Sequence, residues 1–324
     1  MSGNLVGWVF GNVGQTHLYD PEWRPASFDG DLWESEIVAV PPSRGLILSW
    51  NAHTPDWSGI GFRISVQIDG VWTGWVPMGE WRQVFPIRHP DGPIHRDVDT
   101  ATWSGIADAI RVRARLTPSH RDENPTLHRV IVATVPVSSD DTERPLDASD
   151  EPFDVNVPFR SQMDEDPRIA PRICGPTSLA MLLAIREPEV ETRTIATHAY
   201  DAVHDVYGNW AHLAAVAGEH GYAAWVEQFH RLSDVEDRVR VGFGAIVSIA
   251  YEQGELAGSP IPRTNGHLVV LRGRTADGDV ICNDPAFPDE RGNGVVYRRG
   301  EFERLWAEHG GTTILMRPDT VKPT

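Results

Sequence analysis

The chain has 324 residues, and its hydrophobic fraction of 40% is sufficient for two packed cores, which excludes a wholly disordered protein. Its formal net charge of −17 argues against nucleic acid or an anionic membrane as a partner, because both would repel the average surface. No apolar run is long enough to predict membrane insertion, and the first residues lack the pattern of a secretion signal. We therefore expect a cytoplasmic protein, or a secreted one if a leader has been removed.

Residues 1–137 predict a tryptophan-rich accessory domain with an all-β sandwich fold. Apolar and polar residues alternate over 64–68 and again over 110–116, which is typical of strands with one wet face. Asp69-Gly70 separates two such runs and predicts a hairpin, since both turn positions tolerate a positive φ. The segments "GLILSW" and "LHRVIVATV" add strands, and no long helix is predicted, so we expect the sandwich to be antiparallel.

Residues 138–151, "SSDDTERPLDASDE", contain hardly any large apolar side chain and predict a linker to a second domain over 152–324. Beyond this linker, helices are predicted at 174–185 and at 210–220, the latter capped by Asn209. Short β-rich runs follow, namely "GAIVSIAY", "GHLVVLRG", "GDVICND" and "TTILMR", with a helical "GEFERLWAEHGG" between the last two. Helices followed by an antiparallel sheet predict an α+β fold.

The two cysteines, Cys174 and Cys282, are too few for a disulfide framework or a cysteine-rich zinc site. The sequence also lacks HExxH, a phosphate loop and GxGxxG after a strand, so we expect no metal and no cofactor. Cys282 is interpreted as a buried strand residue. Cys174 instead lies at the start of a predicted helix, where free N–H groups and the helix dipole lower the pKa of a thiol.

A base and a group that orients it are predicted from two strand ends. His267 opens the run "GHLVVLRG", and Asp284 ends the next run, "GDVICND". If residues 275–278 form a four-residue hairpin loop, Val269 faces Asp284, and His267 is its diagonal neighbour on the same face. A register change of one residue would send the two side chains to opposite faces. Asn283 is the alternative partner, since an amide also orients an imidazole, and we favour Asp284.

Gln162 lies upstream of Cys174 and could donate its side-chain amide to an oxyanion beside the Cys174 N–H. Four segments in this order resemble the papain superfamily: "VPFRSQMD", "RICGPTSLAMLLA", "NGHLVVLRG" and "ICNDPA". Within it, they resemble cysteine peptidase family thirty-nine and its relatives, the bacterial double-glycine-leader peptidases that process bacteriocins. The resemblance covers residues 153–318. It implies Cys174 as nucleophile and His267 as base, acting on a peptide or protein through a thioester. It also implies Asp284 as orienting group and Gln162 as oxyanion donor.

The chain departs from that family in three ways. Gln162 precedes Cys174 by twelve positions, a longer spacing than in papain-like enzymes, so the insert 164–171 must loop out. No membrane-spanning or ATP-binding region follows, and the N-terminal sandwich is foreign to the exporters of that family. We expect the insert 164–171 and the segment 252–264 to set specificity, the latter as a lid over the cleft.

Two other functions remain open beside that of a cysteine peptidase. An acyltransferase would use the same triad and pass the acyl group from the thioester to an amine. A non-catalytic protein would instead use Trp72, Trp75 and Trp81 as a platform for a glycan or a peptide. We expect these tryptophans to fill the sandwich core or the domain interface, and the arginines of "RVRARL" to form a solvated face.

Overall fold

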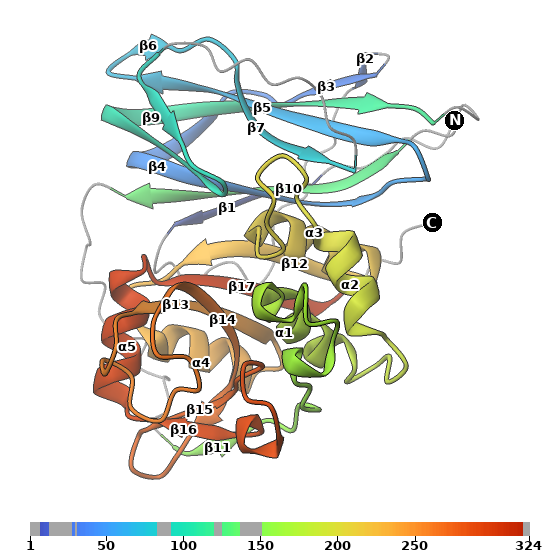
Figure 1. Cartoon of the computed structure of the whole chain (residues 1–324). Helices are drawn as coiled ribbons and strands as arrows, with labels where there is room; N and C mark the ends of the chain where they lie inside the picture. Colours follow the sequence, from blue (N-terminus) through green and yellow to red (C-terminus); the bar gives the residue numbers. More distant parts are fainter. Residues whose placement is uncertain are drawn as a thin grey trace. The chain divides into compact units, whose positions relative to one another are not determined.

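The computed structural model describes residues 7–12, 28–29, 31–82, 92–119, 125–136 and 151–319. Contacts within the chain divide it into two compact units (Figure 1). The first holds residues 1–140 with 202–204 and 323–324, and the second holds residues 141–201 and 205–322. The predicted linker, 138–151, lies outside the described residues except for Glu151.

In the N-terminal unit, the described residues form strands and no helix, as predicted. The strands belong to one sheet of order β1-β10-β4-β9-β3-β2, with β5 paired to β6, β7 and β9, and β8 paired to β9. β1 pairs with β10 in parallel, so the expectation of a purely antiparallel sheet is wrong at this pair. The bounds are β1 Gly7–Asn12, β2 Phe28–Asp29, β3 Leu32–Glu34, β4 Val38–His53, β5 Gly59–Ile68, β6 Val71–Trp72, β7 Val76–Trp81, β8 Ile94–Arg96, β9 Thr100–Thr117 and β10 Thr126–Pro136.

The predicted hairpin turn lies between β5 and β6. Ile68 pairs with Val71, which leaves two residues in the loop. Asp69 has a φ of 49° and Gly70 a φ of 81°, the left-handed values that a tight hairpin of the type I′ class requires at both positions. The alternating burial of β5 and β9 also agrees with the sequence pattern, since their apolar side chains are buried and the intervening arginines are not.

Aromatic side chains fill the core between strands that are not hydrogen-bonded to each other. Trp50 on β4 stacks on Phe62 of β5 with ring centroids 4.3 Å apart, and Trp81 meets Trp50 edge-on at 6.4 Å. Gly79 lies against the Trp50 ring, because a Cβ at this position would be 2.8 Å from it. The sheet therefore folds over so that two layers enclose a common core, and Trp81 fills that core as expected.

Trp72 and Trp75 are only partly buried and do not fill the core, which corrects one of the two expectations; their place at a domain interface stays a prediction. Trp72 pairs with Gln67 across the hairpin, and directly opposite residues share a face, so it lies on the polar side of the sheet. Arg111 covers both rings at 4.8 Å, and Arg113 covers Trp75 at 3.9 Å. The arginines of β9 are therefore partly stacked rather than fully solvated.

The C-terminal unit is α+β, as predicted. Its sheet has the order β12-β17-β13-β14-β15-β16, and β11 pairs with β14. The helices are α1 Cys174–Leu183, α2 Thr192–Ala199, α3 Trp210–Glu219, α4 Leu232–Arg240 and α5 Arg299–Glu308. The strands are β11 Phe153–Asp154, β12 Tyr222–Gln228, β13 Gly244–Tyr251, β14 Thr264–Arg274, β15 Val280–Asn283, β16 Val295–Tyr297 and β17 Thr312–Pro318. Short 3-10 turns lie at η1 Gln162–Asp164, η2 Ala170–Arg172 and η3 Glu290–Gly292.

The helices α1, α2 and α3 pack together, and α1 also packs against β14 (Figure 1). α1 is buried from Gly175 to its end. Its apolar side chains pack against β14 on one side and against α2 and α3 on the other. α4 and α5 contact β13 separately from this cluster. The start of α1 and the strands β14 and β15 thus meet where the helical part joins the sheet.

No helix of the described residues is long and apolar enough to cross a membrane.

Candidate active site

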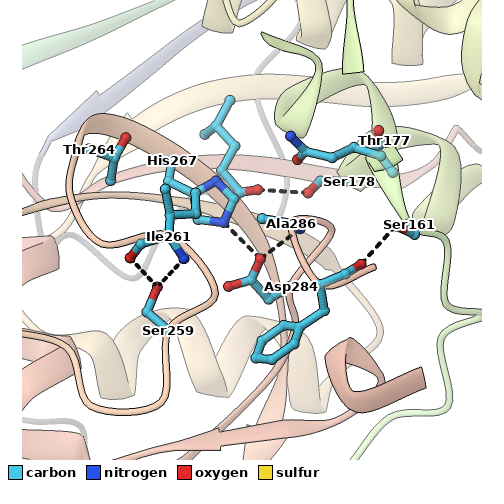
Figure 2. Close-up of polar contacts among 12 residues, drawn as sticks. Ser161, Thr177, Ser178, Ser259, Ile261, Thr264, His267, Asp284 and Ala286 are labelled. Atoms are coloured by element: carbon cyan, nitrogen blue, oxygen red, sulfur yellow. Dashed lines mark hydrogen bonds and ion pairs between the residues drawn. The ribbon is translucent and has the colours of Figure 1, made fainter. Parts of the chain in front are cut away.

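Cys174 is the first residue of α1, at the position predicted from the Cys-Gly-Pro sequence. The residue before it, Ile173, offers no side-chain cap, so the first N–H groups of the helix are not satisfied by a capping side chain. Gly175 permits close packing here, because a Cβ would lie 2.8 Å from methyl groups of both Leu213 and Leu268. Ser178 Oγ then donates to the Leu268 carbonyl at 2.9 Å, which fixes the helix start against β14 (Figure 2).

The thiol of Cys174 is surrounded by groups that favour its charged form. Burial alone would raise its pKa, but the hydrogen bond and positive charge of His267 lower it. Hydrogen bonds with the backbone of Leu268 and of Gly175 lower it further, so the net pKa lies below that of an ordinary thiol. Cys174 retains partial exposure to solvent, whereas the second cysteine, Cys282, is buried and has a raised pKa. Only Cys174 therefore has the environment of a reactive thiolate.

His267 and Asp284 are brought together in the buried interior of the site. The His267 Nε2 atom lies 2.8 Å from Asp284 Oδ1, and because a carboxylate only accepts, Nε2–H is the donor (Figure 2). The exposed fractions of the two residues are 1% and 0%. Burial opposes the charge on His267, but the charge and hydrogen bond of Asp284 outweigh it and raise the His267 pKa to about 10. The same pairing lowers the pKa of Asp284 despite its burial.

The strand register at the site agrees with the expected one, although the expected loop is wrong. Arg274 pairs with Val280, so the loop has five residues, and Thr275 N–H donates to the Asp279 carbonyl to close it. A β-bulge at Arg272 then shifts the register back by one residue. Val270 pairs with Asn283, which is the expected register, and the ladder ends there, one residue before Asp284.

Asn283, the alternative partner for the imidazole, points to the other side and takes part in a separate network. Its Oδ1 accepts from Arg272 Nη1 at 2.9 Å and from Gly294 N–H at 2.9 Å, while its Nδ2 donates to the Val157 carbonyl at 3.0 Å. The bulge residue Arg272 also makes a two-pronged contact with Asp154 of β11, at 3.0 Å from each oxygen. Asn283 is thus fully occupied away from His267.

Sequence reasoning missed Tyr297, which completes the surroundings of Asp284. Its hydroxyl donates to Asp284 Oδ2 at 2.7 Å, and the Ala286 N–H donates to Oδ1 at 2.9 Å. Tyr297 is fully buried, and its own pKa is raised by burial and by the Asp284 charge. The role of Tyr297 depends on the short strand β16, which follows a loop and was not predicted, so no local pattern indicates it.

Gln162 lies in the segment before α1 and is anchored to the loop that follows Asp284. Its N–H donates to the Pro285 carbonyl at 2.8 Å, and Ser161 Oγ donates to the Phe287 carbonyl at 2.7 Å (Figure 2). The side-chain Nε2 donates to the Ala170 carbonyl at 2.7 Å, and the buried Oε1 has no partner among the described residues. The insert 164–171 therefore does not simply loop out: it folds back on the Gln162 amide.

The segment 252–264 is ordered by contacts that begin beside the site. Tyr251 and Ser259 share a hydrogen bond of 2.5 Å, and Ser259 Oγ also accepts from the Ile261 N–H at 3.3 Å. Burial raises the Tyr251 pKa to about 12; the hydrogen bond with Ser259 lowers it in part, and the charges of Asp284 and Cys174 raise it. Nothing among these contacts tests a lid, which stays a prediction.

Among the described residues, no group of three or more His, Cys, Asp or Glu side chains is arranged to hold a metal ion. The start of α1 instead brings together a thiol of lowered pKa and a buried imidazole–carboxylate pair. Residues 155–314 match the model of the peptidase C39-like family, and residues 4–135 match that of the peptidase C39 N-terminal domain. The chain belongs to the peptidase C39-like family.

Two solved structures are similar to this C39-like chain. One, from Bacillus anthracis, is described as a C39-like peptidase; it is 21% identical, with 54% of this chain and 99% of the other covered and a TM-score of 0.39. The second is a double-glycine motif protease from an AMS/PCAT transporter in complex with the leader peptide, again 21% identical, with coverages of 52% and 97% and a TM-score of 0.34. No curated protein matches the chain.

Proposed function

We propose that this chain is a cysteine peptidase whose nucleophile, base and orienting group are Cys174, His267 and Asp284. The observation that carries the proposal is the buried hydrogen bond between His267 and Asp284, beside a thiol of lowered pKa at the start of α1. Membership of the C39-like family supports the same reaction class. Since His267 Nε2 is bound to Asp284, Nδ1 is the ring nitrogen left to exchange a proton with the thiol.

In the first half of the reaction, the Cys174 thiolate attacks the carbonyl carbon of the substrate, and a C–S bond forms as the carbonyl electrons move to oxygen. The resulting oxyanion accepts hydrogen bonds from the Cys174 N–H and from the Gln162 amide. The Gln162 amide has a second hydrogen for this purpose, because Ala170 takes only one. His267 then protonates the amine as the C–N bond breaks, which leaves a thioester.

In the second half, water attacks the thioester while His267 takes the proton, and the collapse of the intermediate releases the acid and the thiolate. Asp284 remains charged throughout and stabilises the imidazolium. An amine in place of water would give acyl transfer with the same residues. Whether the chain hydrolyses or transfers is therefore decided by products rather than by the triad.

Digestion of a peptide library, with products identified by mass spectrometry, tests the proposal. We expect the Cys174→Ala variant to lose cleavage by about 10⁴-fold or more while it unfolds in urea as the wild type does. Cleavage by the variant at the wild-type rate would refute a thiol mechanism. An added amino-acid amide separates the two reactions, since a transferase would yield the amide-linked product at the expense of free acid.

A further inference from the structure

A pocket of about 360 Å³ lies within the C-terminal unit, outside the catalytic group. Its walls come from the insert 164–171, from α2 and from the residues before α3. The lining residues are Asp166, Arg168 and Ile169 of the insert, Arg193, Ala196 and Thr197 of α2, and Tyr200 and Tyr207.

Two chain paths connect the pocket with Cys174. Ile169 precedes Cys174 by five residues, through the tight turn η2. On the other wall, Tyr207 is followed by Gly208, whose Cα would lie 3.6 Å from a Cβ at Gly175. Consecutive Cα atoms are about 3.8 Å apart, so the Cα of Tyr207 lies within about 13 Å of the Cα of Cys174. An extended peptide bound at Cys174 therefore reaches the pocket within about four residues of the bond that is cut.

The aromatic wall is held in place before any ligand binds. The Tyr200 hydroxyl donates to Asp205 Oδ1 at 2.7 Å, and the two tyrosine rings are 4.8 Å apart. The Arg172 guanidinium lies 5.4 Å from the centre of the Tyr207 ring and 3.1 Å from Asp205 Oδ1. These contacts occupy Arg172 and Asp205 with each other and with the tyrosines, so neither adds a free charge to the pocket.

The lining carries one uncompensated positive charge. Asp166 pairs with Arg168, with Nη2 to Oδ2 at 2.5 Å, which neutralises one cation. No described side chain lies within hydrogen-bond or ion-pair distance of the Arg193 guanidinium, although its charge contributes to the lowered pKa of Asp166. Arg193 lies in the first turn of α2, which has no acidic residue, and the N-cap residue Glu191 makes no side-chain cap hydrogen bond. The N-terminal end of a helix carries a partial positive charge, so Arg193 lies beside a pole of its own sign. An anion bound here would therefore be favoured by the Arg193 guanidinium and by the helix dipole.

We propose that this pocket is a specificity subsite for an acidic side chain of the substrate peptide. The methylene groups of the side chain pack on Ile169 and Tyr207, and its carboxylate binds Arg193, with Arg168 beside it. The inference rests on the proposed peptidase function and adds the substrate class. Arg193 is its deciding residue, because Arg168 already has a carboxylate partner.

The test compares wild type, Arg193→Glu and Arg186→Gln with a proteome-derived peptide library. Wild type should cut peptides with Asp or Glu near the cleaved bond, and replacing that residue by its amide should lower kcat/KM about tenfold, the effect of losing a charged hydrogen bond. Arg193→Glu should lose or reverse this ratio. Arg186→Gln, an exposed arginine that contacts Tyr222 instead, should keep the wild-type ratio.

Equal rates for acid and amide peptides, or a ratio that Arg193→Glu does not change, would overturn the subsite. A preference for aromatic residues that is insensitive to position 193 would also overturn it and assign the pocket to apolar side chains. The library is also selected for binding to the Cys174→Ala variant, so the result does not depend on turnover. Failure of the peptidase proposal is separate, since it would appear as an unreactive Cys174 in the wild type.

Discussion

At the scale of single residues, the carboxylate of Asp284 is held by three donors. His267 and the Ala286 N–H bind one oxygen, and the Tyr297 hydroxyl binds the other, all within 2.9 Å. This arrangement fixes the plane of the carboxylate and hence the direction in which His267 presents its other nitrogen. Each donor also favours the charged carboxylate, which explains why its pKa is lowered despite complete burial.

Replacing Tyr297 by Phe removes one of these donors. The free energy of unfolding at pH 7 should fall by about 1–3 kcal/mol, the cost of leaving a buried acceptor unsatisfied. A depressed carboxyl pKa stabilises the fold above the unfolded pKa, and this contribution is lost as pH falls through the folded pKa. In Tyr297→Phe the Asp284 pKa rises. The acid limb of Cys174 alkylation, the pH range in which the alkylation rate falls on acidification, should therefore move to higher pH.

Tyr222→Phe is the matched control for this variant. Tyr222 is also buried, but it lies on β12, at the opposite edge of the sheet from β16, and its hydroxyl interacts with Arg186. It should affect stability in urea without moving the acid limb. An unchanged acid limb in Tyr297→Phe would mean that this tyrosine only fills space.

At the scale of elements, the bulge at Arg272 sets the register of β14 and β15 near the site. Its guanidinium joins Asp154 of β11 to Asn283 of β15 and to Asn293 of the following loop. Gly273 allows this approach, because a Cβ there would collide with the Phe153 carbonyl of β11. The pairing that brings Asp284 beside His267 thus depends on a residue outside the proposed triad.

Arg272→Ala should lower the free energy of unfolding by about 2–3 kcal/mol, because it removes the charge-assisted hydrogen bonds of a buried guanidinium to Asp154 and Asn283. It should also slow Cys174 alkylation, since the register near His267 loses its support. Arg291→Ala, which breaks an exposed pair with Asp289, is the control and should leave the unfolding curve nearly unchanged. Urea titrations of the two variants decide the matter, and equal curves would contradict a structural role for Arg272.

The sequence predicts the elements that carry the triad, because each has a strong local signal. The Cys-Gly-Pro start of α1, the Asp69-Gly70 turn and the apolar run of β14 depend on backbone preferences within a few residues. The sequence analysis does not predict the helices α2 and α4 or the strands β12 and β16. α2 and β16 are short, and the buried β12 lacks alternation. The bulge was missed for a different reason: it compensates the five-residue loop through side chains distant in sequence.

At the scale of the whole molecule, the chain divides into two compact units, each with its own sheet. We predict that a fragment beginning at Glu151 folds without the N-terminal unit and keeps the reactive thiol. The first residue of the fragment matters, because Asp154 of β11 accepts a hydrogen bond from Arg272. A fragment beginning at Asn156 lacks β11 and should unfold at lower urea concentration. Aggregation of the longer fragment, with the full chain soluble, would contradict independent folding.

The central claim is a thiolate at Cys174 that is maintained by His267, and the pH dependence of alkylation by iodoacetamide tests it most directly. Mass spectrometry separates Cys174 from Cys282, which is buried and serves as an internal reference. In the wild type, we predict that Cys174 reacts well below the usual thiol range near pH 8.5. In His267→Ala the thiol stays buried but loses the imidazole that stabilises its charged form. The pKa of Cys174 should therefore rise above that range. Identical profiles in the two proteins, with an ordinary midpoint, would contradict the account.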